Sequence, residues 1–166
     1  MDIDAAGLLP LALAGKPVSP KSVEEIKEII ASTKLPFILK GIMTVKGAVK
    51  AVEAGSYGIV VSNHGGRVMD YSPATVEVLP EICKVVGGQL KIFIDGGIRT
   101  GIDVLKVLAL GADAVLIGRP YGVAAYGGGA EGVEIYTKKI GSELKEAMIM
   151  TGCSTLADIN ESIIYK

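Results

Sequence analysis

The sequence predicts an α/β fold of parallel strands, with about four βα units that amount to half of a (β/α)8 TIM-type barrel. Four short apolar runs recur along the chain, and segments with helical spacing separate them. Polar or glycine residues follow each run directly. Continuous apolar runs, in contrast to alternating ones, are typical of strands buried on both faces of a parallel sheet. Strand, polar turn and helix in repetition therefore indicate βα units.

The chain has 166 residues, of which 49% are hydrophobic, and this predicts a single domain over residues 1–166. A formal net charge of -1 argues against nucleic acid as a partner. No apolar run reaches the roughly 18 residues of a membrane span. The acidic N-terminus is unlike a signal peptide, and two cysteines suit a reducing compartment, so we expect a cytoplasmic protein.

The elements follow in order along the chain. The predicted strands cover residues 36–40, 58–63, 91–95 and 114–118. The predicted helices cover residues 21–33, 44–53, 100–110 with Thr100 as N-cap, and 131–150, and a further helix begins at Ser72 with Pro73 in its first turn. The glycine-rich residues 124–130 predict a loop between a short helical turn and the last helix.

An alternation of strands and helices fits either an open doubly wound sheet or a barrel. Chemically useful residues follow all four predicted strands, and barrels place functional groups at these carboxyl ends, with a phosphate site often on the later units. This favours the barrel. Four units cannot close one, and an open piece leaves two edges and an uncovered inner face. We therefore expect self-association or pairing with a missing half.

The strongest motif follows the second strand and reads Ser62-Asn63-His64-Gly65-Gly66-Arg67. His64 is the only histidine of the chain, and a neutral imidazole is a suitable general base. Arg67 offers a planar fork that binds a carboxylate with two hydrogen bonds. A base beside a carboxylate clamp suits proton abstraction from a small acid. The plain alternative is a strand-to-loop turn with a hydrogen-bonded histidine.

Two glycine turns and one lysine suggest an anion site. The turn after the third strand consists of Asp95, Gly96, Gly97, Ile98 and Arg99. Its amide groups and the helix N-terminus behind it can bind an anion, and Gly118-Arg119 repeats the arrangement one strand later. Lys40 ends the first strand and can neutralise an anion at the same edge. Taken singly, each could also be a tight turn or a lysine extending to solvent.

In this combination the chain resembles the family of FMN-dependent α-hydroxy-acid oxidases and dehydrogenases. The resemblance runs from about residue 35 to 159 and rests on four motifs in the family's order. They are Leu39-Lys40-Gly41, the hexapeptide from Ser62 to Arg67, the turn from Asp95 to Gly101, and Gly118-Arg119-Pro120. The family's fold is an eight-unit barrel, and this chain resembles its C-terminal half, strands five to eight.

The resemblance implies roles for the motif residues. Lys40 would stabilise reduced FMN, Ser62 would touch the flavin, His64 would accept the substrate proton, and Arg67 would bind the substrate carboxylate. The turn from Asp95 to Arg99, with Gly118 and Arg119, would bind the FMN phosphate. Residues 1–4 resemble the tail of the fourth strand, so Asp2 or Asp4 would be the acidic partner of the histidine. No metal is implied.

Three functions stay open at this point. The first is FMN-dependent oxidation of a small 2-hydroxy acid to an α-keto acid, incomplete in a half-length chain. The second is a non-catalytic half-barrel that binds FMN or phosphate without turnover. The third is a structural half-barrel without a ligand. Bound FMN would exclude the third, and reduction of that flavin by a hydroxy acid would separate the first from the second.

Overall fold

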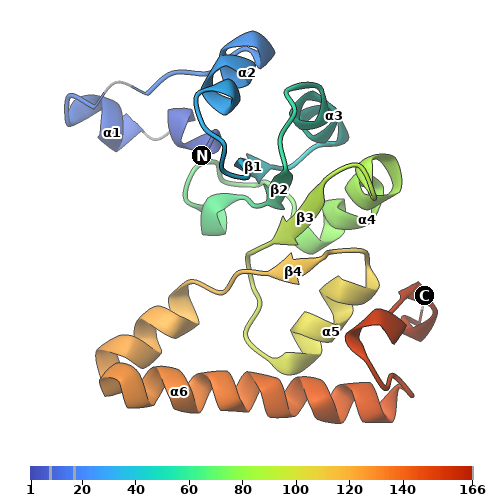
Figure 1. Ribbon diagram of the computed structural model, residues 1–166. Coiled ribbons are helices and arrows are strands. Elements are labelled where there is room, and N and C mark those ends of the chain that lie inside the picture. Colours follow the sequence, from blue (N-terminus) through green and yellow to red (C-terminus); the bar gives the residue numbers. More distant parts are fainter. Residues whose placement is uncertain (8, 17, 166) are drawn as a thin grey trace.

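A four-stranded parallel sheet forms the centre of the protein, and its strands follow one another in chain order (Figure 1). The structure, a computed structural model, describes residues 1–7, 9–16 and 18–165. The strands are β1 (Ile38–Ile42), β2 (Gly58–Val61), β3 (Lys91–Ile94) and β4 (Ala114–Val115). Each is parallel to its neighbour and is joined to it through a helix, which confirms the predicted α/β class.

The helices connect and flank these strands. They are α1 (Leu9–Leu13), α2 (Val23–Ala31), α3 (Val45–Glu53), α4 (Thr75–Val86), α5 (Gly101–Ala109) and α6 (Arg119–Met150). Short 3-10 helices cover Asp4–Gly7, His64–Gly66, Leu156–Asp158 and Glu161–Ile163. Thr100 caps α5 as predicted, because its hydroxyl accepts a hydrogen bond from the amide of Asp103. No helix of the described residues is both long and apolar enough to cross a membrane.

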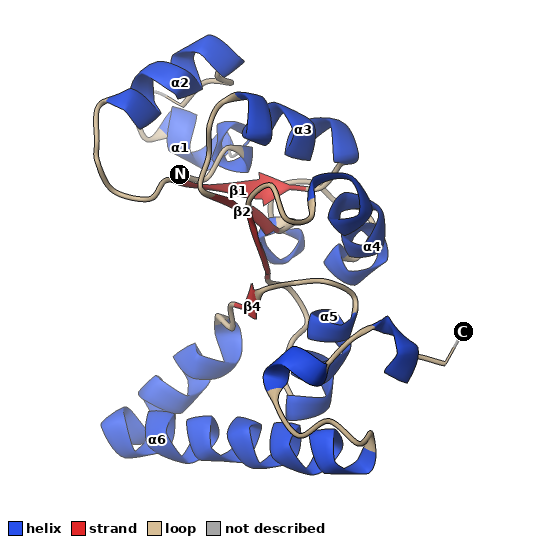
Figure 2. Ribbon diagram, turned by 45° about the vertical axis from the view of Figure 1, so that its right-hand side comes forward, coloured by secondary structure: helices blue, strands red, loops and turns tan. Residues whose placement is uncertain are grey.

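Helices α3, α4 and α5 lie along one side of the sheet (Figures 1 and 2). The main core lies between them and the strands, and all four residues of β2 are buried. Ile59, Ile92 and Ile94 of the middle strands are at most 1% exposed. A second, smaller cluster joins α5 to the C-terminal segment around Leu105 and Cys153. The sheet is thus firmly backed on its helical side.

Two predicted elements differ in the structure. Helix α4 begins at Thr75, so Ser72 does not cap it; instead the Glu77 carboxylate accepts a hydrogen bond from the amide of Ala74. The predicted loop at residues 124–130 is helical within α6, and only Gly129 leaves the helical region, at φ 56° and ψ -140°. The helix bends sharply there and continues as its long second segment (Figure 1).

Candidate active site

The carboxyl ends of the four strands surround a cleft of about 480 Å3. Strand ends meet at one edge of a parallel sheet, so residues far apart in sequence line the same cavity. Every site residue predicted from the sequence contributes to its wall except Ser62. The lining residues among them are Lys40, His64, Arg67, Asp95, Gly96, Gly97, Ile98, Arg99, Gly118 and Arg119.

Lys40 lies between two carboxylates. Its Nζ is 3.2 Å from Oδ1 of Asp2 and 3.5 Å from Oδ2 of Asp95. Residues 1–3 bring Asp2 here by pairing with Lys40 in parallel, as the resemblance to a fourth-strand tail implies. The next residue, Gly41, has φ +100°, and a Cβ atom there would lie 2.6 Å from Cγ of Asp4. Glycine thus lets the acidic N-terminal segment approach the end of β1.

His64 is held in a fixed orientation by its backbone and its ring. It has a positive φ of 56°, and its amide donates to the Ser62 hydroxyl at 3.1 Å. Its Nδ1 lies 3.3 Å from the carboxylate of Asp4 and 4.0 Å from that of Asp2. Asp4 is therefore the nearer acidic partner. A proton on Nδ1 that is donated to Asp4 leaves Nε2 as the basic nitrogen.

Ser62 is placed beneath the cleft and not in its wall. Its side chain is fully buried at the end of β2, where the hydroxyl oxygen accepts the hydrogen bond from His64. In this arrangement Ser62 supports the unusual backbone conformation of the histidine, which is costly for a residue other than glycine. A direct flavin contact by Ser62 stays a prediction.

The cleft contains every arginine of the chain, Arg67, Arg99 and Arg119. Within the described residues none of the three has a carboxylate within 4.0 Å, whereas Lys40 has two. Arg67 is fixed by a hydrogen bond from its Nε to the carbonyl of His64 at 3.1 Å. Guanidinium groups without a carboxylate partner are well suited to bind a carboxylate or a phosphate.

The turn after β3 offers only some of the amides that the sequence predicts. The amides of Arg99 and Thr100 donate to Oδ2 of Asp103, at 3.0 and 2.9 Å, and the amide of Gly101 donates to Glu143 at 2.8 Å. The N-terminus of α5 is therefore already occupied by carboxylates, and the predicted use of this helix end for an anion is wrong. Gly97 and Ile98, just before it, have amides without an acceptor in the described part of the chain.

The start of α6 supplies the second group of amides. Gly118 and Arg119 line the cleft, and the first amides of a helix have no partner within it. A Cβ atom on Gly65 would lie 3.3 Å from Nη2 of Arg119, so the missing side chain leaves room for this guanidinium beside the histidine loop. The helix start and the turn after β3 lie along one edge of the cleft, called the anion-binding edge below because its amides and guanidinium groups can donate to an anion.

On another side of the cleft, two carboxylates lie beside the imidazole of His64. One ligand atom from each of Asp2, Asp4 and His64 lies within 4.8 Å of the others, a spacing that a metal ion would accept. In this structure Lys40 already pairs with Asp2, and Asp4 already contacts the imidazole. The arrangement is accounted for by these contacts, as expected for a histidine oriented by a carboxylate.

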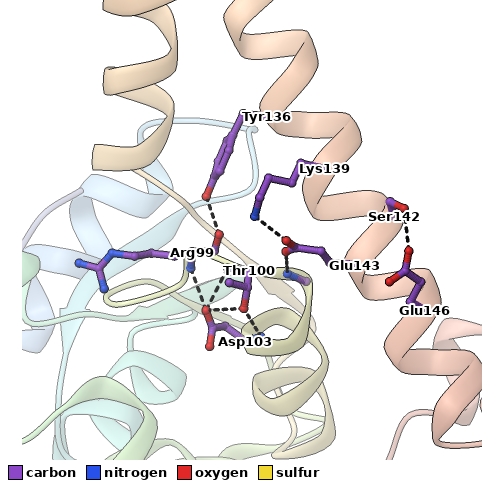
Figure 3. A network of polar contacts seen from close by, with 9 residues as sticks. Arg99, Thr100, Asp103, Tyr136, Lys139, Ser142, Glu143 and Glu146 are labelled. Carbon is purple, nitrogen blue, oxygen red and sulfur yellow. Dashed lines mark hydrogen bonds and ion pairs between the residues drawn. The ribbon is translucent and has the colours of Figure 1, made fainter.

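Three supporting residues were not predicted from the sequence. The Thr75 hydroxyl at the start of α4 donates to the carbonyl of Asp95 at 2.6 Å. The Tyr136 hydroxyl donates to the carbonyl of Arg99 at 3.0 Å, and Glu143 accepts from Gly101 (Figure 3). The last two come from α6; the family resemblance also includes Glu143-Leu144-Lys145, but neither Tyr136 nor Glu143 was assigned a role from the sequence. Only the fold brings them to the turn.

Comparison with known proteins identifies the family of the chain. Residues 12–166 match the model of a family described as FMN-dependent dehydrogenase. A peroxisomal (S)-2-hydroxyacid oxidase of Arabidopsis thaliana is 50% identical over 144 residues, which are 86% of this chain and 38% of that protein. An L-lactate oxidase of Lactobacillus jensenii is 46% identical over 155 residues, 92% of this chain and 37% of its own length.

Solved structures show the same relation. A mandelate oxidase crystallised with 3,3-difluoro-2-hydroxy-3-phenylpropionic acid superposes with a TM-score of 0.83 at 42% identity. The match covers 88% of this chain and 44% of that one, so the chain spans less than half the length of the relatives it matches. The family match covers nearly the whole sequence. The chain therefore belongs to the family of FMN-dependent dehydrogenases.

Proposed function

We propose that the chain provides the base, the carboxylate clamp and the phosphate site of an enzyme that oxidises an α-hydroxy acid to an α-keto acid with FMN. One observation carries the proposal: His64, oriented by Asp4 at 3.3 Å, shares a cleft with three arginines that have no carboxylate partner among the described residues. The relatives named 2-hydroxyacid oxidase, L-lactate oxidase and mandelate oxidase support the substrate class.

The residues of the cleft fit FMN. Its phosphate would be held by Arg99 and Arg119, by the free amides of Gly97 and Ile98, and by the start of α6. Lys40 would lie at the flavin and balance negative charge there, with its own position fixed by Asp2 and Asp95. When bound, FMN supplies the two-electron oxidant that no protein side chain of the cleft provides.

His64 acts as the base in this proposal. The substrate would lose two hydrogens and two electrons: Nε2 of His64 would take one hydrogen as a proton, with Nδ1 bonded to Asp4, and the electron pair and the other hydrogen would go to FMN. The Asp4 carboxylate then stabilises the imidazolium that forms, as a carboxylate does for histidine bases in general. The 16% exposure of the His64 side chain lets a substrate in the cleft reach it.

Arg67 holds the substrate carboxylate. Its Nε is engaged with the His64 carbonyl, so the two terminal nitrogens are left for a ligand. The hydrogen bond to the His64 carbonyl therefore fixes Arg67, the carboxylate clamp, next to His64, the base. This places the carbon next to the carboxylate beside the imidazole, which is the carbon to be oxidised.

Anaerobic addition of a 2-hydroxy acid to the FMN-loaded chain tests the proposal. We expect the flavin absorbance to bleach, and His64→Ala to abolish bleaching while FMN stays bound. Arg99→Ala should instead weaken FMN binding. Normal reduction in the His64 variant would reject the base assignment, and equal FMN occupancy in the Arg99 variant would reject the phosphate role.

A non-catalytic FMN-binding half-barrel is the second candidate. The three arginines of the cleft and the amides beside them come from this chain alone, and this favours it. In that case FMN binds through the anion-binding edge, and a 2-hydroxy acid leaves the flavin oxidised. Adding the N-terminal half of a relative as a separate chain would restore reduction if the site lacks only groups from that half.

Association is part of the same proposal. The sheet has four strands, and β4 pairs through only two residues, so the inner face and this edge offer a surface for a second half-barrel. We propose self-association or pairing with an N-terminal half, which light scattering measures directly; a monodisperse monomer would refute it.

We also propose a cytoplasmic location, from the free thiols of Cys83 and Cys153.

A further inference from the structure

The backbone of Arg99 is held by hydrogen bonds to two helices, α5 and α6. Its amide donates to Asp103 of α5, and its carbonyl accepts from the Tyr136 hydroxyl of α6. The Arg99 side chain extends away from α5 and from the long second segment of α6 (Figure 3), into the cleft that it lines together with the start of α6. With both polar backbone groups fixed, the direction in which the guanidinium leaves the backbone is determined by residues outside the cleft.

Tyr136 also contacts the other half of the anion-binding edge. Its ring packs edge-on against Tyr121, with centroids 4.9 Å apart and an interplanar angle of 82°. Tyr121 lies in the first segment of α6, two residues after Arg119, and its hydroxyl pairs with Thr137 at 2.9 Å. One side chain thus joins the start of α6 to the turn that carries Arg99.

Glu143 adds a second connection about two turns further along α6. It accepts from the amide of Gly101 at 2.8 Å and is held by Lys139. The Lys139 ammonium and the Gly101 amide lower the pKa of the Glu143 carboxyl, so it stays an acceptor near neutral pH. Burial raises the pKa of Tyr136, whose hydroxyl therefore stays a donor.

We propose that Tyr136 and Glu143 are positioning residues that hold Arg99 and the start of α6 at the spacing a ligand phosphate needs. The inference rests on the proposed function, because the ligand is the phosphate of FMN. Neither residue lines the cleft. Their effect on binding therefore passes through the turn from Arg99 to Gly101 and through Arg119.

Riboflavin, which is FMN without its phosphate, provides the test. Dissociation constants for FMN and riboflavin are measured on the full chain by fluorescence titration. We expect Tyr136→Phe, which keeps the ring against Tyr121, to weaken FMN about two- to tenfold, the range for one lost hydrogen bond, with riboflavin unchanged. Glu143→Gln should act in the same direction.

Matched controls come from the same helix. Tyr126 is fully exposed, and Glu146 contacts only Ser142 in the network of Figure 3, so Tyr126→Phe and Glu146→Gln should leave both constants unchanged. Hydrogen exchange in the ligand-free chain adds a measurement without flavin. The amides of residues 99–101 should exchange faster in Tyr136→Phe than in the Tyr126 control.

The outcomes separate this inference from the proposed function. An equal loss of FMN and riboflavin affinity in Tyr136→Phe would mean a general structural role and would overturn the inference. Unchanged FMN affinity, or unchanged exchange at residues 99–101, would overturn it as well and leave the proposed function standing. No binding of FMN by the unsubstituted chain would overturn the proposed function and this inference together.

Discussion

Replacing Gly101 by alanine tests how tightly α5 is seated on α6. A Cβ atom at this position would lie 2.1 Å from the nitrogen of Leu144, 2.5 Å from the carbonyl carbon of Glu143 and 2.6 Å from the oxygen of Ile140. All three are backbone atoms, which cannot rotate aside. Contacts of normal length would require the helices to separate by about 1.4 Å.

The energetic cost follows from this geometry. Overpacking costs about 1–3 kcal/mol, and alanine returns at most about 1 kcal/mol through its higher helix propensity. We expect a net loss of about 2 kcal/mol in the free energy of unfolding. Gly141 is the matched control, because it lies in α6 with nothing within 4 Å of its added Cβ. Gly141→Ala should stabilise the protein by about 0.5–1 kcal/mol.

Urea unfolding followed by circular dichroism measures the free energy of unfolding of both variants, and thermal unfolding measures their melting temperatures. The opposite signs predict a difference of about 3 kcal/mol, or roughly 6–12 °C between the melting temperatures of the two variants. Equal stabilities, or a Gly101→Ala variant more stable than the control, would refute the close contact between α5 and α6. The same result would weaken the argument that α6 positions the turn before α5.

Three further predictions concern the site and its surroundings. Asp4→Asn should slow anaerobic flavin reduction by about 10²–10⁴ without loss of FMN, because an amide no longer fixes the proton on Nδ1 of His64; an unchanged stopped-flow rate would contradict this. Burial raises the pKa of Asp103, but hydrogen bonds from backbone amides outweigh it and the net shift is downward. The stabilisation by this carboxylate is therefore complete above the usual aspartate pKa and is lost as the pH falls through the lower folded value, and acid titration should show a smaller loss in Asp103→Asn. Burial, with a contribution from Asp113, raises the pKa of Cys83 to about 11, so iodoacetamide should modify it at least roughly 100-fold more slowly than free cysteine at pH 8, and equal rates would contradict its burial.

The sequence was sufficient for the sheet because its strands are continuous apolar runs. Residues 58–61 are all buried, and nothing but a central parallel strand suits such a run between two helical segments. The last strand is shorter than predicted, since pairing with β3 ends at Val115. Its apolar continuation, Leu116 and Ile117, lines the cleft instead.

Helix boundaries were less predictable where two signals competed. Ser72-Pro73 is a good N-cap pair, but Glu77 caps the amide of Ala74 and sets the start two residues later. The glycines of residues 124–130 predicted a loop, yet only Gly129 departs from helical geometry. Local propensity is weak against the packing of Gly132 on the carbonyl of Ala124, where a Cβ atom would not fit.

The sequence predicted those residues of the candidate site that lie at or just after strand ends. Motifs at the predicted strand ends pointed to Lys40, His64 and Arg99, and all three line the cleft, although β1 continues past Lys40 to Ile42. The prediction that the N-terminus of α5 binds an anion was wrong, since amides there donate to the carboxylates of Asp103 and Glu143. One of these, Glu143, lies 42 residues away, and only the fold brings it to Gly101.

The placement of all arginines at one cleft has a practical consequence. An arginine-selective dicarbonyl such as phenylglyoxal would modify arginines in this cavity alone, because the chain has no others. Mass spectrometry of the labelled peptides would then map occupancy residue by residue, and any anion that protects Arg99 and Arg119 reveals itself as a ligand without a single substitution. The extent of arginine labelling in this chain therefore reports directly on anion binding in the cleft.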